Sequence, residues 1–238
     1  MIELYIFDQG GVLSRDFDIG PEAARRLGLG LPEFRALAAP DLMPFMRGEI
    51  DSAEFWRRFE ARSGLKAAED YWRTLFRPRL DGETVELVRE LSRGARTVSG
   101  TNTIAVHHEI NLALGHHDAV QAVYASHLMG FAKPEPEFWL AILEAEGVAP
   151  GRAFFVDDYP ENVEAARSLG LEARLYVSAA ELRRELCALG APVAPVAPAE
   201  HAEGLAAVGA PTVIRMRRQA DQGPARQRLH RLPGREHP

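Results

Sequence analysis

Polar residues of four kinds stand at the ends of short apolar runs or in the loops between them, and together they carry the groups that phosphoryl transfer needs. Asp8 follows LYIF, Ser99 ends ARTVS, Asp157 and Asp158 follow AFFV, and Lys133 lies in the loop GFAKPEPEF. A carboxylate can attack phosphorus, a hydroxyl can hold a phosphate oxygen, and an ammonium can neutralise the charge that accumulates. We therefore expect a site for an anionic substrate in which Asp8 and Lys133 act in catalysis.

The loop after Asp8 suits the close approach of a phosphate group. Gly10 and Gly11 have no side chains, so their backbone N–H groups can come near a bound anion. One oxygen of Asp8 can bind a metal ion while the other attacks phosphorus. We expect Asp8 to be nucleophile and metal ligand, and Gly11 to bind substrate. The alternative for an aspartate at the end of a strand is a helix or turn cap.

The segment after the run ARTVS is predicted to bind substrate. Ser99 is followed by Gly100, Thr101 and Asn102. This places a hydroxyl and backbone donors at a helix start, where phosphate oxygens bind readily. Taken alone, Ser99 is better explained as a helix cap, because serine caps helices in many proteins. Its functional interpretation depends on the other strand ends.

Asp157 and Asp158 predict a metal site. Two adjacent carboxylates at the end of a strand repel each other unless they share a cation. Oxygen ligands without a neighbouring histidine or cysteine favour Mg²⁺. Asn162 follows in the first turn of the next predicted helix, where it would orient Asp158 or a metal-bound water. The alternative is that the aspartates cap this helix.

The order of the predicted elements indicates an α/β fold with a doubly wound parallel sheet. Short β-branched runs alternate with amphipathic helices after residue 82. Ligands of open parallel sheets bind beyond the carboxyl ends of the strands, and most of the candidate residues lie at such ends. The expected strands are residues 4–7, 95–99, 119–125, 153–156 and 175–177.

Residues 15–81 are predicted to form an all-helical insertion, which we call the cap. Apolar residues recur there at helical intervals, and no strand pattern interrupts them. The core domain is expected to comprise residues 1–14 and 82–188. Residues 189–238 begin with an alanine- and proline-rich stretch and end rich in arginine, so we expect a disordered tail.

Composition narrows the classes of function. The chain has 238 residues, 46% of them hydrophobic, and a formal net charge of −6, which gives no attraction to nucleic acid or to an anionic membrane. No apolar run approaches the ~20 residues of a transmembrane helix. The single cysteine, Cys187, and the lack of a signal-peptide pattern favour the cytoplasm. Amphipathic helices leave the choice between monomer and homodimer open.

Two pairs of adjacent histidines are not expected to bind metal. His107 and His108, like His116 and His117, point in different directions if they lie on a helix, and no third ligand accompanies them at a suitable spacing. We predict that these four side chains face solvent.

The motifs FDQGGVL, VSGTN, FAKPEPEFW and FFVDDYPENVEAARSLG resemble, in order and spacing, those of the haloacid dehalogenase (HAD) superfamily over about residues 1–180. The chain is most similar to the branch with a helical cap that includes sugar-phosphate phosphatases and haloacid dehalogenases. The resemblance implies a HAD-type Rossmannoid core and Mg²⁺-dependent hydrolysis of a small phosphorylated metabolite through an aspartyl-phosphate on Asp8. It also implies that Ser99 binds phosphate, that Lys133 stabilises charge, and that Asp158 is the main magnesium ligand, assisted by Asp157.

One position departs from this family's pattern. Most of its phosphatases carry an aspartate two residues after the nucleophile that protonates the leaving group, and here that residue is Gly10. The magnesium contact made there by relatives uses the backbone carbonyl, which Gly10 retains. Dehalogenases also lack this aspartate, but they lack the acid pair too, so Asp157 and Asp158 favour phosphate. The alternatives are a 2-haloacid hydrolase and a catalytically weakened phosphate-binding protein.

Overall fold

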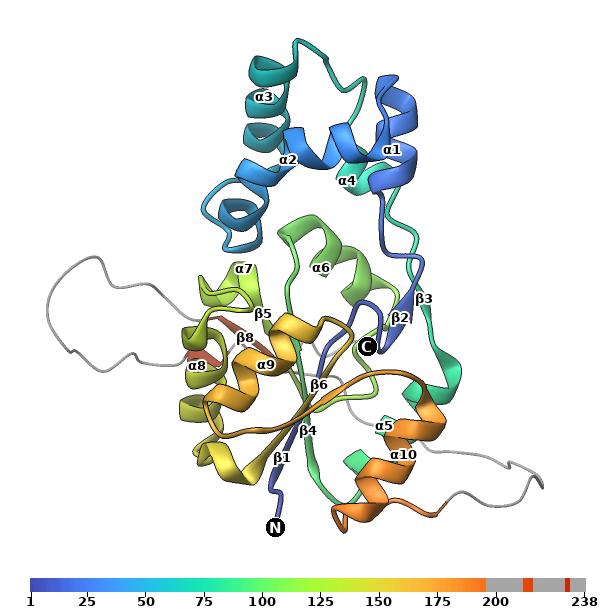
Figure 1. Cartoon of the computed structure of the whole chain (residues 1–238), viewed down its shortest axis with the longest axis vertical. Coiled ribbons are helices and arrows are strands. Elements are labelled where there is room, and N and C mark those ends of the chain that lie inside the picture. The colour runs from blue at the N-terminus through green and yellow to red at the C-terminus, as the bar shows by residue number, and fades with distance from the viewer. Residues whose placement is uncertain (196–211, 216–229, 232–238) are drawn as a thin grey trace, which may run out of the picture.

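The computed structural model describes residues 1–195, 212–215 and 230–231 (Figure 1). The cap helices gather at one end of the molecule, and the sheet with its covering helices forms the rest. The elements are β1 (Leu4–Phe7), β2 (Ser14–Arg15), α1 (Gly20–Leu27), α2 (Leu31–Met46), α3 (Ser52–Ser63), α4 (Tyr71–Thr74), β3 (Arg79–Leu80), α5 (Gly82–Ser92), β4 (Arg96–Thr101), α6 (Ala105–Ala113), β5 (Ala122–Ala125), α7 (Ser126–Met129), α8 (Pro136–Glu146), the 3₁₀ turn η1 (Pro150–Arg152), β6 (Ala153–Asp157), α9 (Pro160–Ser168), β7 (Glu172–Leu175), α10 (Ala179–Ala188), β8 (Thr212–Arg215) and β9 (His230–Arg231).

The central sheet confirms the predicted doubly wound α/β fold. Its strand order is β7-β6-β1-β4-β5-β8-β9. The strands from β7 to β8 pair in parallel, and β9 runs antiparallel to β8. The first strand of the chain therefore lies between β4 and β6, as expected where an open sheet reverses its winding direction.

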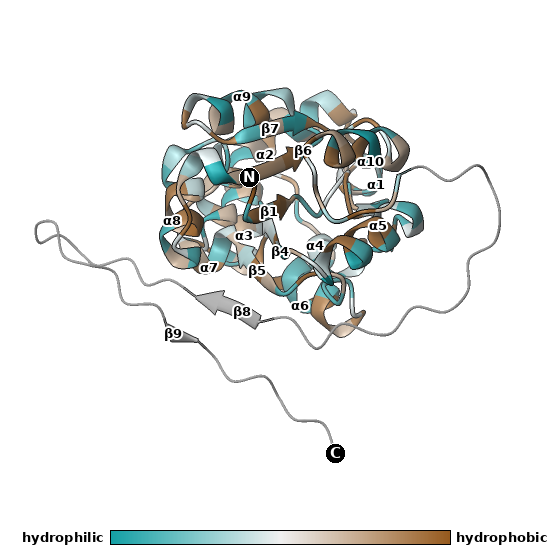
Figure 2. Ribbon diagram, turned by 90° about the horizontal axis from the view of Figure 1, so that it is seen from below, coloured by the Kyte–Doolittle hydropathy of each residue, from teal (hydrophilic) through white to brown (hydrophobic). Residues whose placement is uncertain are grey.

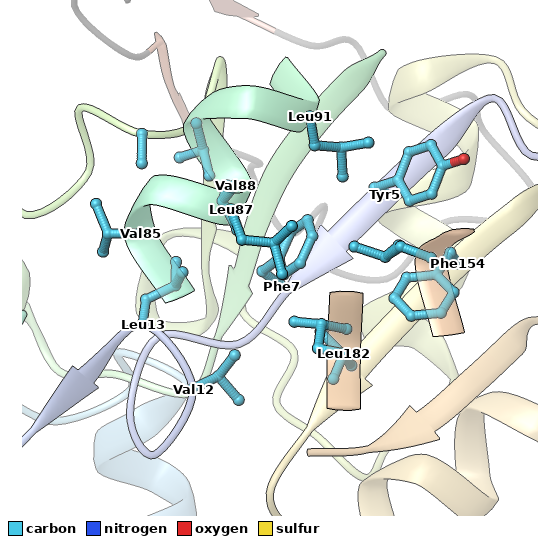
Figure 3. Packing of buried hydrophobic residues seen from close by; sticks show 14 of the residues in the cluster. Tyr5, Phe7, Val12, Leu13, Val85, Leu87, Val88, Leu91, Phe154 and Leu182 are labelled. Atoms are coloured by element: carbon cyan, nitrogen blue, oxygen red, sulfur yellow. The ribbon is translucent and has the colours of Figure 1, made fainter. Parts of the chain in front are cut away.

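Two hydrophobic layers cover the sheet because successive strand residues point to opposite faces. On one face, Leu4 and Ile6 pack with apolar residues of α8 and α9. On the other, Tyr5 and Phe7 pack with residues of α5 and α10, such as Leu87 and Leu182 (Figure 3). Seen from below, β1 and β6 lie at the hydrophobic centre, with helices around them (Figure 2). Since both faces of β1 are buried, the strand contains apolar residues without alternation.

The cap has a hydrophobic core of its own. Helices α1 to α4 contribute an aromatic cluster in which Phe55 and Phe59 are fully buried. Ile104 and Val106, at the start of α6, belong to the same cluster, so the cap rests on this part of the core domain. The linkers to the cap pair as an antiparallel ribbon of β2 and β3. All four cap helices fall inside residues 15–81; the limits of the two domains remain a prediction.

Some predicted strands have different limits in the structure. The last core strand is residues 172–175 rather than 175–177, and the strand predicted at 119–125 begins at Ala122. Strand β7 contains Glu172 and Arg174, which form an ion pair. Its neighbour in the core domain is β6 alone, so one edge of β7 stays open to polar side chains, and the sequence lacks the apolar signature of a buried strand.

The predicted disordered tail, residues 189–238, lies mostly outside the described residues. Within it the structure places β8, which extends the sheet beside β5, and β9, which pairs with β8. The sequence analysis expected neither strand. Among the helices in the described ranges, none has the length and apolar character required to cross a membrane.

Candidate active site

The strand register brings three predicted site positions to one edge of the sheet. Phe7 is paired with Ser99 of β4 and with Val156 of β6, so the next residue, Asp8, lies between Gly100 and Asp157. Ile6 and Phe155 face the layer formed by α8 and α9. Because side chains alternate along a strand, Asp8 and Asp157 point to this same face.

Lys133 joins the two carboxylates. Its side chain comes from the loop between α7 and α8 and is almost fully buried, with 2% of its surface exposed. Nζ lies 2.8 Å from Oδ1 of Asp8 and 2.6 Å from Oδ2 of Asp157, and it donates to the carbonyl oxygen of Gly100 at 3.1 Å. An ammonium has three protons, so these partners use all of them.

The loop that carries Lys133 is braced from β4 and from its own end. The Asn102 side-chain amide donates to the carbonyl of Lys133, and its oxygen accepts from the Lys133 N–H, both at 2.8 Å. Glu135 accepts from the N–H of Ala132 at 2.9 Å. The expectation that Asn102 binds substrate stays a prediction; its side chain holds the backbone of Lys133.

The two aspartates of the acid pair differ in their hydrogen-bond partners. Asp157 is fully buried; its Oδ1 accepts from the Tyr159 N–H at 2.8 Å and from Nδ2 of Asn162 at 3.0 Å, while its Oδ2 accepts from Lys133. Asn162 thus orients Asp157 rather than Asp158. Oδ1 of Asp158 is buried without a hydrogen-bond partner, so this oxygen is open to a ligand.

The carboxylates of Asp8, Asp157 and Asp158 fit a magnesium ion. One oxygen from each residue lies within 4.8 Å of the others. Hard oxygen ligands of this kind suit Mg²⁺, which keeps several water ligands. Because both oxygens of Asp157 already have partners, Asp8 and Asp158 carry the oxygens most available to a metal.

Burial and crowding of charge shift the ionisation of the site. Burial raises the pKa of Asp8 to about 7, and the charges of Asp157 and Asp158 act in the same direction, while Lys133 opposes them. Burial also raises the pKa of Asp158, with Asp157 adding to the effect. Burial works against the charged form of Lys133, but Asp8 and Asp157 outweigh it and raise the pKa of the ammonium. A bound cation would favour ionised carboxylates here.

Gly11 is required by its surroundings. Its φ of +79° lies in the left-handed region, and a Cβ at this position would collide with the carboxylate of Asp158. The loop after the nucleophile therefore passes directly against a predicted metal ligand. Arg15 donates to the Gly11 carbonyl oxygen and forms an ion pair with Asp81 at 3.0 Å, which ties both cap linkers to this loop.

The hydroxyl groups of β4 are placed differently from the sequence expectation. Strand β4 continues to Thr101, so Ser99 is not its last residue. Ser99 is fully buried, and its Oγ has no hydrogen-bond partner. Thr101 keeps 4% of its surface exposed at the carboxyl edge of the sheet. Of the two hydroxyls, that of Thr101 lies at the open end of the strand.

The prediction that the paired histidines face solvent is wrong. His108 and His117 expose only 5% and 2% of their surface, and His116 exposes 8%. His107 stacks on Phe76 of the cap segment, with ring centroids 3.6 Å apart. The doublet on α6 places the ring of His108 beside those of His117 and His127 and the ring of His107 against Phe76, an arrangement that local spacing does not reveal.

Two contacts between the cap linkers or cap and the core were not recognised from the sequence. Phe17, just after β2, lies against Gly10, where a Cβ would be 3.2 Å from its ring. Arg47, at the end of α2, donates from Nε to Glu135 at 3.2 Å, next to the lysine loop. No periodicity signals such contacts: Arg47 and Glu135 are 88 positions apart, and the contact of Phe17 with Gly10 depends on how the chain turns after β2.

A model of haloacid dehalogenase-like hydrolases matches residues 2–170. The chain belongs to this family. It is therefore an enzyme of the hydrolase class, in agreement with the resemblance inferred from its motifs. The match includes the nucleophile loop, the lysine loop and the acid pair, together with the inserted cap.

Named phosphatases are among the relatives of the chain. A phosphatase of Mycobacterium tuberculosis is 40% identical over 79 residues, which are 32% of this chain and 36% of that protein. The chain thus spans about a third of the length of that relative. A sesquiterpene phosphatase of Aspergillus oryzae is 29% identical over 171 residues, or 70% of this chain and 85% of that protein.

Solved structures show the same fold. A HAD family enzyme from Bacteroides thetaiotaomicron, in complex with magnesium and inorganic phosphate, superposes with a TM-score of 0.62 at 23% identity. The alignment covers 74% of this chain and 95% of that one. At this identity the likeness establishes the architecture, and the chemistry of this chain must be argued from its own residues.

Proposed function

We propose that this protein is a Mg²⁺-dependent phosphatase of a small phosphorylated metabolite, with sugar phosphates among the compounds to test, and that it acts through an aspartyl-phosphate on Asp8. The observation that carries the proposal is the arrangement around this carboxylate. Lys133 holds one oxygen of Asp8 at 2.8 Å. Asp158, which has one buried oxygen without a hydrogen-bond partner, belongs with Asp8 and Asp157 to the cluster of three carboxylates. Asp8 is thereby fixed beside a place for a cation.

The residues of the chain account for the first chemical step. The ammonium of Lys133 holds Asp8 in one orientation and neutralises charge that builds up between the nucleophile and the phosphoryl oxygens. The Thr101 hydroxyl and the backbone of Gly11 are the proposed phosphate contacts, with Ser99 and Gly100 behind them. Asp157, held by Asn162, keeps Lys133 in place.

A magnesium ion would be held by Asp8, Asp158 and the Gly10 carbonyl, with Asp157 assisting. When bound, it would neutralise the phosphoryl oxygens and so permit the approach of an anionic nucleophile. The buried partnerless oxygen of Asp158 supports this ligand set, because a buried carboxylate oxygen without a partner is costly unless something binds it.

Two other functions compete with this proposal. A 2-haloacid hydrolase would use Asp8 as nucleophile but has no need for the acid pair. A catalytically weakened phosphate-binding protein is favoured by Gly10, which offers no carboxylic acid. We further propose, from composition alone, that the partner is a small molecule rather than nucleic acid or membrane and that the enzyme is cytoplasmic, as monomer or homodimer.

The proposal is tested by hydrolysis of p-nitrophenyl phosphate at several Mg²⁺ concentrations, with and without a chelator. The wild type is compared with Asp8→Asn and with Asp118→Asn, an exposed aspartate of the core domain that serves as matched control. We expect magnesium-dependent turnover that Asp8→Asn abolishes and Asp118→Asn retains. Hydrolysis that persists in Asp8→Asn, or turnover of haloacids alone, would refute the proposal.

A further inference from the structure

An aromatic ring occupies the space beside the residue two positions after the nucleophile. A Cβ at Gly10 would lie 3.2 Å from Cδ2 and Cε2 of Phe17 and 3.4 Å from Cγ. Phe17 is partly buried and packs against the hydrophobic cluster of the cap. This side of the nucleophile loop therefore presents apolar surface, and it has no room for a further side chain unless the ring moves.

The polar groups around Asp8 are already engaged with other partners. The ammonium of Lys133 directs its three protons to Asp8, Asp157 and the Gly100 carbonyl. Asp157 has partners at both oxygens, and Asp158 belongs to the proposed metal site. None of these three groups is therefore left to give a proton to a departing oxygen.

The direction of the displacement brings the leaving group to the apolar side. Asp8 follows the carboxyl end of β1, the end of the sheet that the cap covers (Figure 1). In-line attack places the leaving oxygen opposite the attacking carboxylate oxygen, and hence toward the cap. Phe17 reaches Gly10 from the linker that leads into the cap.

We infer that this site selects phosphorylated compounds whose leaving group departs as a stable anion: acyl phosphates, phosphoanhydrides and aryl or enol phosphates. The inference rests on the proposed phosphatase function and narrows its substrate class. Alkyl phosphates, including primary sugar phosphates, release a strongly basic alkoxide that needs a proton from the enzyme. With Gly10 and Phe17 at this position, none of the described side chains beside the nucleophile loop supplies that proton.

The chemistry balances without an acid. An Asp8 oxygen forms a bond to phosphorus while the bond from phosphorus to the leaving oxygen breaks, and that oxygen keeps the electron pair. A carboxylate, phosphate or phenolate leaves as the anion. Water then attacks phosphorus, the bond to Asp8 breaks and returns its electron pair to the carboxylate, and both protons of the water leave with the released phosphate. Since Gly10 offers no carboxylate to accept a proton from the water, this second step limits turnover of the better substrates.

The first experiment measures kcat/KM of the wild type, with Mg²⁺, for acetyl phosphate, p-nitrophenyl phosphate, phenyl phosphate and glycerol phosphate. We expect a steep decline as the leaving group becomes more basic, with the alkyl ester at least about 10²-fold below p-nitrophenyl phosphate. For the two activated substrates we expect a similar kcat and a burst of leaving group. Comparable kcat/KM values for glycerol and p-nitrophenyl phosphates would overturn the inference.

The second experiment restores an acid. In Gly10→Asp/Phe17→Ala the smaller residue leaves space for a carboxyl group, and Gly10→Asn/Phe17→Ala is the matched variant whose amide cannot donate as an acid. We expect the aspartate variant to hydrolyse glycerol phosphate about 10²-fold faster than the asparagine variant, with a much smaller difference for acetyl phosphate. Equal rates of the two variants on both substrates would contradict the role assigned to this position.

Tyr159 is the phenol that must be separated from this account. Its side chain is half-exposed and interacts electrostatically with Asp8 and Asp158. Tyr159→Phe keeps the ring and removes the hydroxyl. We expect the same dependence on leaving group as in the wild type, and a dependence that becomes steeper would identify Tyr159 as the proton donor and refute the inference.

The failure of this inference is distinguishable from failure of the proposed function. Magnesium-dependent hydrolysis that needs Asp8 but is insensitive to the leaving group would leave the phosphatase intact and remove only the restriction on substrates. Lack of hydrolysis across the whole series, acetyl phosphate included, would reject the phosphatase itself.

Discussion

The sheet edge and the cap are stabilised by different kinds of interaction. At the edge, Lys133, Asp8 and Asp157 are buried charges in contact with one another. The cap is held by packed aromatic rings, with ion pairs on its surface such as that of Arg25 with Glu22. A buried charge has few acceptable partners, whereas an apolar cluster accepts many sequences. We therefore expect substitutions to be less tolerated at the sheet edge than in the cap.

The largest difference between the two regions is expected when each of the two lysines of the chain is replaced by methionine and the losses of activity and stability are compared. Lys133→Met leaves two buried carboxylates without their counter-charge, so we expect about 10³-fold loss of activity and about 3–5 kcal/mol loss of folding free energy. Lys66→Met, in the cap, removes an exposed charge and should change stability by less than about 0.5 kcal/mol. Rates and denaturant unfolding of both variants test this, and similar losses in the two would refute the contrast.

Glycines with positive φ provide a second comparison. Gly11 and Gly64 have φ values of +79° and +72°, so alanine strains the backbone at either position by about 1–2 kcal/mol. A Cβ at Gly11 also meets Asp158, while at Gly64 nothing lies within 4 Å. We expect Gly11→Ala to raise the Mg²⁺ concentration for half-maximal activity about tenfold, by displacing Asp158. An unchanged magnesium requirement would show that Gly11 does not position this ligand.

Buried histidines make the core domain sensitive to acid. Burial lowers the pKa of His108 to about 4 and that of His117 to about 3, with His108 itself contributing to the second shift. The unfolded chain binds these protons near pH 6.5, before the folded protein does. Stability is thus complete above pH 6.5 and declines as pH falls toward 4, by about 1–2 kcal/mol for each ring at pH 5. Thermal unfolding of His108→Phe should depend less on pH than that of the wild type over this range.

The smallest effect is expected where cap and core meet. Arg47 and Glu135 form a half-buried ion pair beside the lysine loop. Arg47→Met keeps most of the apolar stem, so we expect a change of about 1 kcal/mol or less and a severalfold rise in KM, with kcat nearly unchanged. Steady-state kinetics of Arg47→Met and Glu135→Gln test this. A large fall in kcat for Arg47→Met would place the cap contact within the chemistry.

The sequence was most informative where function depends on strand ends. Asp8 and Asp157 were correctly expected at one edge, because apolar runs mark buried parallel strands and such strands end together. The side-chain contacts of Asn102 with the Lys133 backbone and of Asn162 with Asp157 were not predicted. The bond from Asn102 to Lys133 spans 31 positions, and the choice of Asn162 between two adjacent aspartates depends on a few ångströms. Sequence spacing predicts neither a contact between residues so far apart in the chain nor a difference in position of this size.

Apolar and aromatic surroundings were the least predictable. The burial of His117 depends on how α6 packs, and the contact of Phe17 with Gly10 depends on how the linker turns after β2. Strand β7 begins three residues before the predicted strand, because its polar side chains give no pattern of a buried strand. Each of these features arises from tertiary packing, which overrides local preferences.

The most direct test of the account is to trap the covalent intermediate. The enzyme is mixed with acetyl phosphate and Mg²⁺ and quenched in acid within the first turnover. After digestion, the mass of the peptide that contains Asp8 is measured by mass spectrometry. We predict that this peptide gains the mass of one phosphoryl group in the wild type and not in Asp8→Asn. Product released in the first turnover without any phosphorylated Asp8, or a phosphoryl group found on another residue, would contradict the central claim.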